Sequence, residues 1–236
     1  MLAVYNGEKF LKQQIDSLLE QTYKDIKIVV RDDGSTDNSC LIIDDYCEEY
    51  PDKICRIIGQ PTGSAKQNFA RLLEHCDSDY IMFCDQDDVW LPDKIEKTML
   101  AMKAAEENGD IPVLVHTDLK IANQQLNVIS NSLFDFQKLI HDNITLPKLL
   151  VQNYVTGCTV MINRALKNVC GQLPDSCIMH DWWLALTAVL FGKLVFENSA
   201  TILYRQHSEN QVGSKASYGI AYVKQKLSAF KQVRNT

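Results

Sequence analysis

The sequence contains no run of about eighteen or more apolar residues, so it predicts no membrane-spanning helix. Its first ten residues, MLAVYNGEKF, show neither the basic start nor the apolar stretch of a signal peptide. The eight cysteines include no CxxC pair, which argues against a zinc cluster. These absences predict a cytoplasmic chain whose cysteines are reduced thiols, packed mostly as small hydrophobic residues.

The chain also lacks the excess of basic residues that is typical of proteins that bind duplex nucleic acid. Its formal net charge is −6 and its isoelectric point is about 5.4, so we expect no nucleic-acid partner. Of its 236 residues, 46% are hydrophobic. That is enough for a real core, in one large domain or in one domain with an appendage.

Short apolar runs alternate with helical patterns in the first half of the chain. Runs at 26–30, 54–58 and 80–84 predict strands, and the spacing of Leu11, Ile15 and Leu18 predicts a helix between the chain start and the first of these runs. Further helices are predicted over 37–50 and from a cap at Ser64. This order predicts an α/β fold with a single Rossmann-like, mostly parallel sheet flanked by helices, together with a smaller second part.

The second half is less regular. Pro92 predicts the start of a helix that runs to about residue 103, and strands are expected at 113–116 and 156–162. A strongly apolar helix over 181–191 is closed by Gly192. The stretch from 120 to 153 has no clear assignment. Residues 1–5 look like the final part of a strand, so we expect that a few upstream residues are missing.

The first chemical motif is DDGSTDNS, at residues 32–39, directly after a predicted strand. Ligands bind at the carboxyl ends of parallel strands, where Asp32 and Asp33 could accept hydrogen bonds from a base or a ribose. Gly34 permits a sharp turn. A loop that only caps the next helix is at least as good an explanation of this motif alone.

The second motif is CDQDDVW, at residues 84–90, after the next apolar strand. Three carboxylates within four residues repel one another unless a cation or protons lie between them. Asp85 and Asp87 are two apart and could face the same side. Such oxygen ligands suit Mg²⁺ or Mn²⁺; Asp88 is a candidate supporting or capping residue. The alternative is an acidic solvated loop.

Two further motifs lie near the end of the chain. HDWWLAL, at 180–186, places Asp181 before an apolar helix, where burial would raise its pKa toward that of a general base. On spacing alone, a helix cap is the better interpretation of Asp181. YRQHSENQVG, at 204–213, offers Arg205 and His207 as phosphate or metal contacts, or as an ordinary polar loop.

Taken in order, these motifs resemble the family 2 glycosyltransferases, which are inverting enzymes of the GT-A fold, and in particular rhamnosyltransferase-like bacterial members. The resemblance runs from AVYNGEKFLKQQIDSLLEQTY through VVRDDGSTDNS, GSAKQNFARLL and DYIMFCDQDDVWLPDKI to TGCTVMINR, HDWW and YRQHSENQVG. The QxxRW motif of longer members is absent, which argues against a processive synthase of the cellulose or chitin type.

The resemblance implies roles for individual residues. The donor nucleotide would contact Tyr5, Asp32, Asp33, Lys66 and Asp85. A divalent metal, Mn²⁺ or Mg²⁺, would be held by Asp87, Asp85 and His207. Asp181 would be the catalytic base, and Trp182 and Trp183 would line the acceptor.

The resemblance therefore predicts transfer of a sugar, rhamnose favoured, from a nucleotide-diphosphate donor (dTDP-rhamnose or a UDP-sugar) to a hydroxyl of a glycan or lipid-linked acceptor in cell-surface polysaccharide synthesis. The alternatives are a non-catalytic sugar-nucleotide-binding or scaffold protein and a sugar-1-phosphate nucleotidyltransferase. The latter would need a glycine-rich phosphate loop near the N-terminus, which MLAVYNGEK matches poorly.

We expect three segments. Residues 1–110 would bind the nucleotide sugar, and 111–213 would complete the glycosyltransferase domain with the acceptor-binding half. Residues 214–236 carry five basic and no acidic side chains, with Ile220, Val223, Leu227 and Phe230 at helical spacing. This predicts a basic amphipathic helix that either contacts the inner face of the membrane peripherally or packs on its own domain.

Overall fold

The structure is a computed structural model that describes residues 1–107, 109–139 and 144–207. The strands are β1 (Leu2–Val4), β2 (Ile28–Asp32), β3 (Ile54–Ile57), β4 (Tyr80–Met82), β5 (Val89–Trp90), β6 (Val113–Ala122), β7 (Val128–Ser130), β8 (Val160–Asn163) and β9 (Lys193–Arg205). The helices are α1 (Leu11–Leu19), α2 (Ser39–Glu49), α3 (Ala65–His75), α4 (Lys94–Glu106), α5 (Leu133–Gln137), α6 (Leu146–Val151), α7 (Arg164–Cys170) and α8 (His180–Phe191), with a 3₁₀ turn η1 at Gly157–Thr159.

Two sheets meet at the start of the chain. The first is parallel, in the order β1-β2-β3, and the second is mixed, in the order β4-β8-β6-β9-β5, with β7 paired to β6. A parallel bridge between Leu2 and Cys84 joins the two sheets. Within the mixed sheet, β6 and β9 are parallel, whereas β4 with β8, β6 with β8 and β5 with β9 are antiparallel. The predicted α/β class is therefore confirmed. The expected single, mostly parallel sheet is instead divided into a parallel sheet, β1–β3, and a mixed sheet in which only β6 and β9 pair in parallel.

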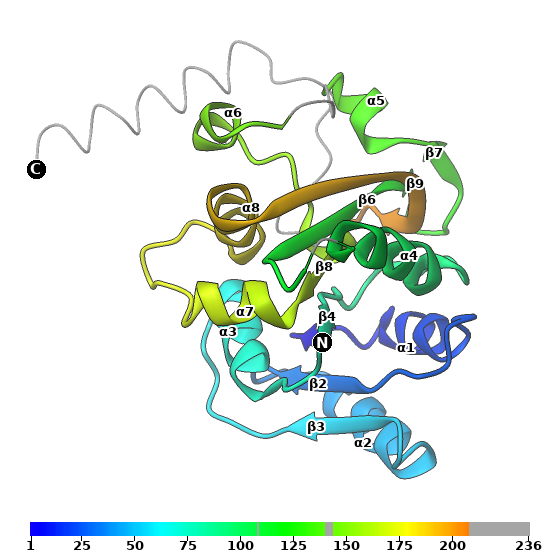
Figure 1. Ribbon diagram of the computed structural model, residues 1–236. Helices are drawn as coiled ribbons and strands as arrows, with labels where there is room; N and C mark the ends of the chain where they lie inside the picture. Colours follow the sequence, from blue (N-terminus) through cyan, green and yellow to red (C-terminus); the bar gives the residue numbers. More distant parts are fainter. Residues whose placement is uncertain (108, 140–143, 208–236) are drawn as a thin grey trace, which may run out of the picture.

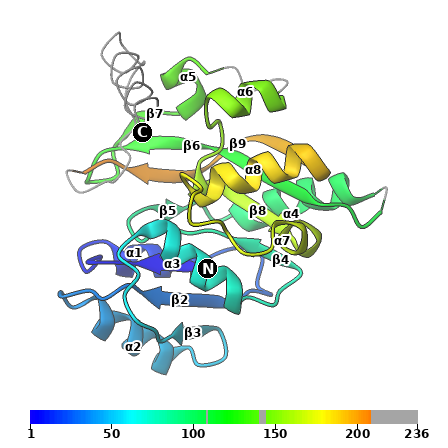
Figure 2. The same ribbon diagram turned by 90° about the vertical axis from the view of Figure 1, so that its left-hand side faces the viewer.

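Helices cover both faces of these sheets. Figure 1 shows α3, α7 and α8 on one side and α1 and α4 on the other, and the turned view of Figure 2 looks onto α3, α7 and α8. One buried cluster contains Leu2, Ile15 and Val30 together with Leu119 and Ile202. The hydrophobic core therefore runs through both of the halves that we expected from the sequence.

Several local predictions are confirmed. Leu11, Ile15 and Leu18 are buried on one face of α1. The Ser64 side chain caps α3 by accepting a hydrogen bond from the Gln67 amide, and Phe69 and Leu72 are buried.

The unassigned stretch contains β7, α5 and α6. None of the described helices is long and apolar enough to cross a membrane. The predicted helix at 214–236 lies outside the described residues.

Candidate active site

The loops that follow β1 and β2 are held together by side-chain hydrogen bonds. The Asn6 amide donates to the Ser35 hydroxyl at 2.8 Å, and the Asn6 side chain accepts from the Thr36 amide at 2.8 Å. Asn6 has a left-handed backbone, with φ of 51°, which asparagine tolerates better than most residues. Tyr5, the predicted base-lining residue, is 55% exposed at the start of this loop, where its ring is accessible to a ligand.

Asp32 and Asp33 are buried and hold the loops around them. Asp32 accepts hydrogen bonds from the amides of Gly34 and Ser35, both at 2.9 Å, and Gly34 makes the predicted sharp turn with φ of 89°. Asp33 pairs with Arg31 at 2.8 Å and accepts from the Thr62 amide at 2.7 Å. Burial raises the pKa of Asp33, but the hydrogen bonds from Arg31 and the Thr62 loop outweigh it and lower this pKa overall.

The acidic loop after β4 is fastened to β1 by Gln86. The Gln86 side chain accepts from the Tyr5 amide at 2.7 Å and donates to the Tyr5 carbonyl oxygen at 2.9 Å. The oxygen and the nitrogen of the Gln86 side-chain amide therefore both bind the backbone of Tyr5. This pair of hydrogen bonds holds the loop of Asp85 and Asp87 beside the loop that follows β1. Sequence reasoning gave Gln86 no role.

Asp85 lies in an unfavourable environment for a negative charge. Burial, together with the nearby charges of Asp87 and Asp181, raises its pKa to about 7. A group whose pKa is raised in this way releases its proton more readily when a cation lies beside it. Asp181 is on α8, so the acidic loop lies close enough to this predicted base for the two charges to interact.

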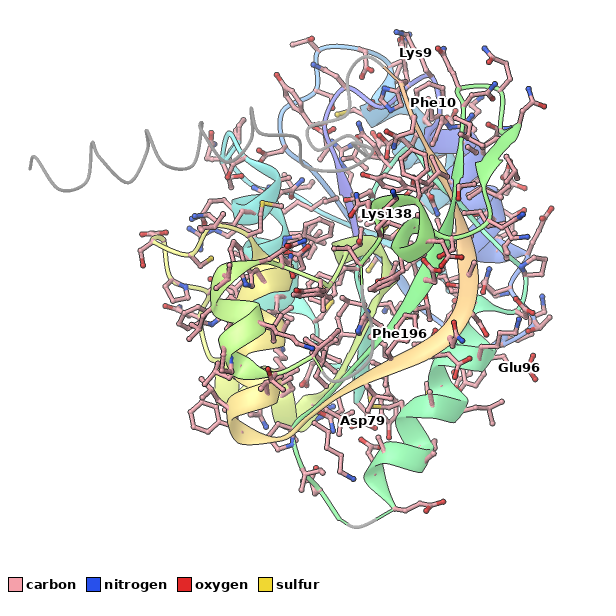
Figure 3. The ribbon with its side chains drawn as sticks, turned by 90° about the horizontal axis from the view of Figure 1, so that it is seen from above. Lys9, Phe10, Asp79, Glu96, Lys138 and Phe196 are labelled. Carbon is pink, nitrogen blue, oxygen red and sulfur yellow. The ribbon has the colours of Figure 1, made fainter. Side chains whose placement is uncertain are left out.

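Asp87 is in direct contact with His207. The carboxylate oxygen lies 2.8 Å from the imidazole Nε2, and both side chains are largely buried. The His207 ring packs on Phe10 with a centroid distance of 4.8 Å, and Figure 3 places Phe10 near the end of the curved β9 ribbon. The structure thus brings together two of the three predicted metal ligands.

Arg205 supports this arrangement from inside the fold. Its guanidinium donates to the Asp87 carbonyl oxygen at 2.7 Å, to the Gln124 carbonyl oxygen at 2.6 Å and to the Gln13 side chain at 2.7 Å. It also lies over the Phe10 ring at 4.5 Å. With 2% of its surface exposed, Arg205 organises the acidic loop, which differs from the phosphate contact that its sequence motif suggested.

A second group of possible ligands lies deeper. Asp85, Asp88 and Cys158 have ligand atoms within 4.8 Å of one another. Burial raises the pKa of the Cys158 thiol well above its usual value, so the thiolate form that binds metals is disfavoured. Asp88 is fully buried and accepts a hydrogen bond from the Arg205 amide at 3.1 Å. Mn²⁺ and Mg²⁺ prefer oxygen ligands, so the carboxylates of Asp85 and Asp87 suit them better than this thiol does.

A buried lysine lies under the same loop. Lys94, in the first turn of α4, is fully buried, and its ammonium lies 4.6 Å from the centroid of the Trp90 ring. Burial lowers the pKa of Lys94 to about 8, although the nearby thiols Cys158 and Cys84 and the carboxylate Asp88 favour its charged form. Lys94 therefore offsets part of the negative charge beneath the loop. Its spacing in the sequence resembles that of an ordinary surface lysine, so no local signal identified it.

Asp181 is in the first turn of α8 and is not its N-cap, which is Met179. The helix-cap interpretation of Asp181 is therefore wrong. Its carboxylate accepts from the Trp182 amide at 2.6 Å. Burial raises the pKa of Asp181 to about 6, while hydrogen bonds from Trp182, Gly157 and Asn153 counteract part of that rise. Neither supporting residue was predicted: Asn153 lies in the unassigned stretch, and Gly157 belongs to the TGCTVMINR segment but was given no role.

The residues around Asp181 fix the start of α8. The His180 ring packs against both Phe69 and Phe83, with centroid distances of 4.4 and 5.2 Å. The Trp182 indole donates to the Leu149 carbonyl oxygen at 2.6 Å, which ties α8 to α6. Trp182 and Trp183 are both half-buried, so each leaves part of its surface for a ligand. Their predicted role in lining the acceptor stays a prediction.

Lys66 has protein partners in this structure. Its ammonium donates to the carbonyl oxygens of Asp175 at 2.6 Å and Cys177 at 2.8 Å, in the segment before α8. These contacts lie on the side of α3 that faces α8. The contact of Lys66 with the donor nucleotide stays a prediction.

Comparison with known proteins gives one clear family. A model of the family described as "Glycosyl transferase family 2" matches residues 1–170. The dTDP-rhamnosyl transferase RfbG of Shigella flexneri is 30% identical, over 94% of this chain and 76% of RfbG. The uncharacterized glycosyltransferase RT0329 of Rickettsia typhi is 28% identical, over 88% of this chain and 63% of that protein.

Solved structures show the same fold. TarS residues 1–349 from S. aureus, in complex with UDP-GlcNAc, matches with a TM-score of 0.65 at 16% identity, over 94% of this chain and 62% of TarS 1–349. The mannosyltransferase PcManGT from Pyrobaculum calidifontis, in complex with GDP-Man and Mn²⁺, has a TM-score of 0.65 at 17% identity, over 89% of this chain and 56% of PcManGT. The expected GT-A fold is thereby confirmed. The chain spans less than two thirds of both solved proteins and of RT0329.

Proposed function

This chain belongs to glycosyl transferase family 2, and we propose that it transfers a sugar from a nucleotide-diphosphate donor to a hydroxyl group with inversion at the anomeric carbon. Rhamnose is the favoured sugar, because the 30% identical relative is named a dTDP-rhamnosyl transferase. A UDP-sugar is the alternative donor. The acceptor is a glycan or a lipid-linked saccharide in cell-surface polysaccharide synthesis.

The observation that carries this proposal is that the 3₁₀ turn η1 touches both Asp85 and Asp181, which come from the loop after β4 and from α8. The Cys158 sulfur lies within 4.8 Å of an Asp85 carboxylate oxygen, and the backbone amide of Gly157 donates a hydrogen bond to Asp181. Asp85 belongs to the group proposed to hold the donor, and Asp181 is the proposed base. A donor and an acceptor bound between them would bring the anomeric carbon and the attacking hydroxyl together.

In the proposed reaction, the acceptor oxygen attacks the anomeric carbon as its proton passes to the Asp181 carboxylate. The bond from the anomeric carbon to the diphosphate oxygen breaks, and the nucleoside diphosphate leaves with the bonding electron pair. The Trp182 amide hydrogen bond holds the Asp181 carboxylate in place. A pKa of about 6 leaves Asp181 ionised at neutral pH and still basic enough to take a proton.

Asp85, Asp87 and His207 would hold a Mn²⁺ or Mg²⁺ ion, which supplies Lewis-acid stabilisation of the charge on the departing diphosphate when it is bound. We assign the donor base and ribose to Tyr5, Asp32 and Asp33. Tyr5 and Asp33 directly follow β1 and β2, Asp32 is the last residue of β2, and Gln86 joins the acidic loop to Tyr5.

Trp182 and Trp183 are the proposed acceptor contacts. Both follow Asp181 directly on α8, and both are half-buried. Flat aromatic faces beside the base would pack against an acceptor sugar.

We also propose that the chain works in the cytoplasm with peripheral contact at the inner face of the cell membrane, where a lipid-linked acceptor would be presented. The basic and apolar residues of 214–236 support this contact. Flotation of the full chain with phosphatidylglycerol vesicles, but not with neutral phosphatidylcholine vesicles, is the expected result. Equal flotation with both would contradict the proposal.

A donor panel tests the reaction itself. The purified chain is incubated with dTDP-rhamnose, UDP-glucose, UDP-GlcNAc and GDP-mannose, each with Mn²⁺, and release of the nucleoside diphosphate is measured. We expect dTDP-rhamnose to release its nucleoside diphosphate fastest. The Asp181→Asn variant should release no more nucleoside diphosphate than a reaction without enzyme. Release from none of the four donors, or a transfer product with retained anomeric configuration, would contradict the proposed function.

A further inference from the structure

Two neighbouring side chains on α3 hold the segment that leads into α8. The Lys66 ammonium donates to the carbonyl oxygens of Asp175 and Cys177, at 2.6 and 2.8 Å. The side-chain amide of Gln67 donates to the Asp175 carboxylate at 2.8 Å. Three hydrogen bonds from one helical turn thus reach a stretch of three residues. Cys177 is only four residues before Asp181, the proposed base.

The held segment has little other support among the described residues. Asp175 and Ser176 are exposed, and Ile178 is 72% exposed. Within the connection between α7 and α8, the Cys177 amide makes a turn hydrogen bond to the Pro174 carbonyl oxygen at 3.0 Å. A segment with few buried apolar contacts depends on its polar contacts for its position. The three hydrogen bonds from α3 therefore fix the path by which the chain enters α8.

The same turn of α3 is joined to the donor side of the site. The loop before α3 is held by Asp33, which accepts hydrogen bonds from the amides of Thr62 at 2.7 Å and Gly63 at 2.8 Å. The Ser64 hydroxyl then caps α3 by accepting a hydrogen bond from the backbone amide of Gln67. Asp33 is a proposed donor contact, and Lys66 lies three residues after Gly63. One short stretch of chain thus touches the donor side at one end and the segment before Asp181 at the other.

The geometry points to Lys66 as a positioning residue that sets the place of Asp181 by holding residues 175–177, rather than as a nucleotide contact. The ammonium has three donors, and two of them are used on carbonyl oxygens of this segment. The packing of His180 against Phe69 and Phe83 also anchors α8, so losing Lys66 would displace the base without detaching the helix. This inference rests on the proposed function for its kinetic consequence, but not for its structural one.

The test compares Lys66→Met with Arg71→Met. Methionine keeps most of the aliphatic stem and removes the donors. Arg71 is a matched control on the same helix, because its ion pair with Glu74, at 3.0 Å, lies at the surface. Hydrogen–deuterium exchange of the peptide over 172–179 should become at least about fivefold faster in Lys66→Met and stay unchanged in Arg71→Met.

The kinetic readout separates positioning from binding. For Lys66→Met we expect kcat to fall about tenfold, because a small displacement of a reacting group is costly, while the Kd for dTDP with Mn²⁺ stays within about twofold. Lys66→Arg, which retains donors, should recover most of the loss. Gln67→Glu, which sets a carboxylate against Asp175, should accelerate exchange over 172–179 as Lys66→Met does.

Two outcomes would overturn the inference. A dTDP affinity weakened about tenfold, with kcat unchanged at saturating donor, would make Lys66 a nucleotide contact. Unchanged exchange over 172–179 in Lys66→Met would mean that the hydrogen bonds do not hold the segment. If the wild-type chain transfers no sugar, the proposed function fails, while faster exchange confined to 172–179 still supports the role of Lys66.

Discussion

The carboxylate of Asp87 and the imidazole of His207 lie 2.8 Å apart, although 120 residues separate them in the chain. Asp87 belongs to the loop after β4, whereas His207 follows the last residue of β9 by two positions. The site is therefore complete only when β9 has paired with its neighbours. This contact gives the metal proposal its most specific tests.

Asp87→Asn should lower metal-dependent turnover at least about a hundredfold, because an amide is a poor ligand for a hard cation and the charge that holds it is lost. Nucleotide binding should weaken only when Mn²⁺ is present. Asp93→Asn is a suitable control, since Asp93 makes an exposed ion pair with Lys97 at 2.7 Å. Full wild-type activity in excess EDTA would rule out the metal requirement.

His207→Ala should act on metal affinity more than on the chemical step. The concentration of Mn²⁺ needed for half-maximal activity should rise about tenfold or more, and high Mn²⁺ should restore most of kcat. Titration of Mn²⁺ at saturating donor measures this directly. A lowered kcat with an unchanged Mn²⁺ requirement would assign His207 to positioning Asp87 alone.

Turnover should depend on pH through Asp181. Burial raises its pKa to about 6, and only the ionised carboxylate accepts a proton, so kcat should fall about tenfold per pH unit below about 6. Asp85, whose pKa is raised to about 7, should stay ionised at saturating Mn²⁺ because a bound cation favours its charged form. The profile of kcat at saturating metal and donor checks this. A kcat that stays constant down to about pH 4.5 would contradict a buried base.

Local patterns predicted the positions of the acids but not their partners. Asp32 is the last residue of β2, and Asp85 and Asp87 lie in the loop that follows β4; ligands bind outside such carboxyl ends of strands in α/β folds. The partners of these acids come from distant segments. Arg205 reaches Asp87 across 118 residues, and Lys66 reaches Asp175 across 109.

Such contacts depend on how helices and strands pack, which no short motif encodes. Asn153 and Gly157, which hydrogen-bond Asp181, lie before η1 and at its start. Gln86 looks in the sequence like a spacer between two acids, yet it clamps Tyr5 with both ends of its amide. Only the folded chain shows that these residues support the site.

The effect of Asp181 on folding stability distinguishes a buried base from an acid that stabilises the fold. The folded-state pKa of Asp181, about 6, lies above its ordinary value of 3.8. Burial of this charge therefore costs stability progressively as the pH rises through about 6, and the cost is absent below about 4. Replacing Asp181 by Asn removes the buried charge. The melting temperature of Asp181→Asn at pH 7.5 should be at least that of the wild type.

The most direct test of the account is the turnover of Asp181→Asn with its donor affinity measured in the same preparation. Asparagine keeps the size of the side chain and can still accept a hydrogen bond from the Trp182 amide, but it cannot take the acceptor proton. We predict that kcat falls about a hundredfold or more, with the Kd for the nucleotide sugar within about twofold of wild type and an undiminished melting temperature. Turnover within a few-fold of wild type would contradict the assignment of Asp181 as the base and with it the proposed mechanism.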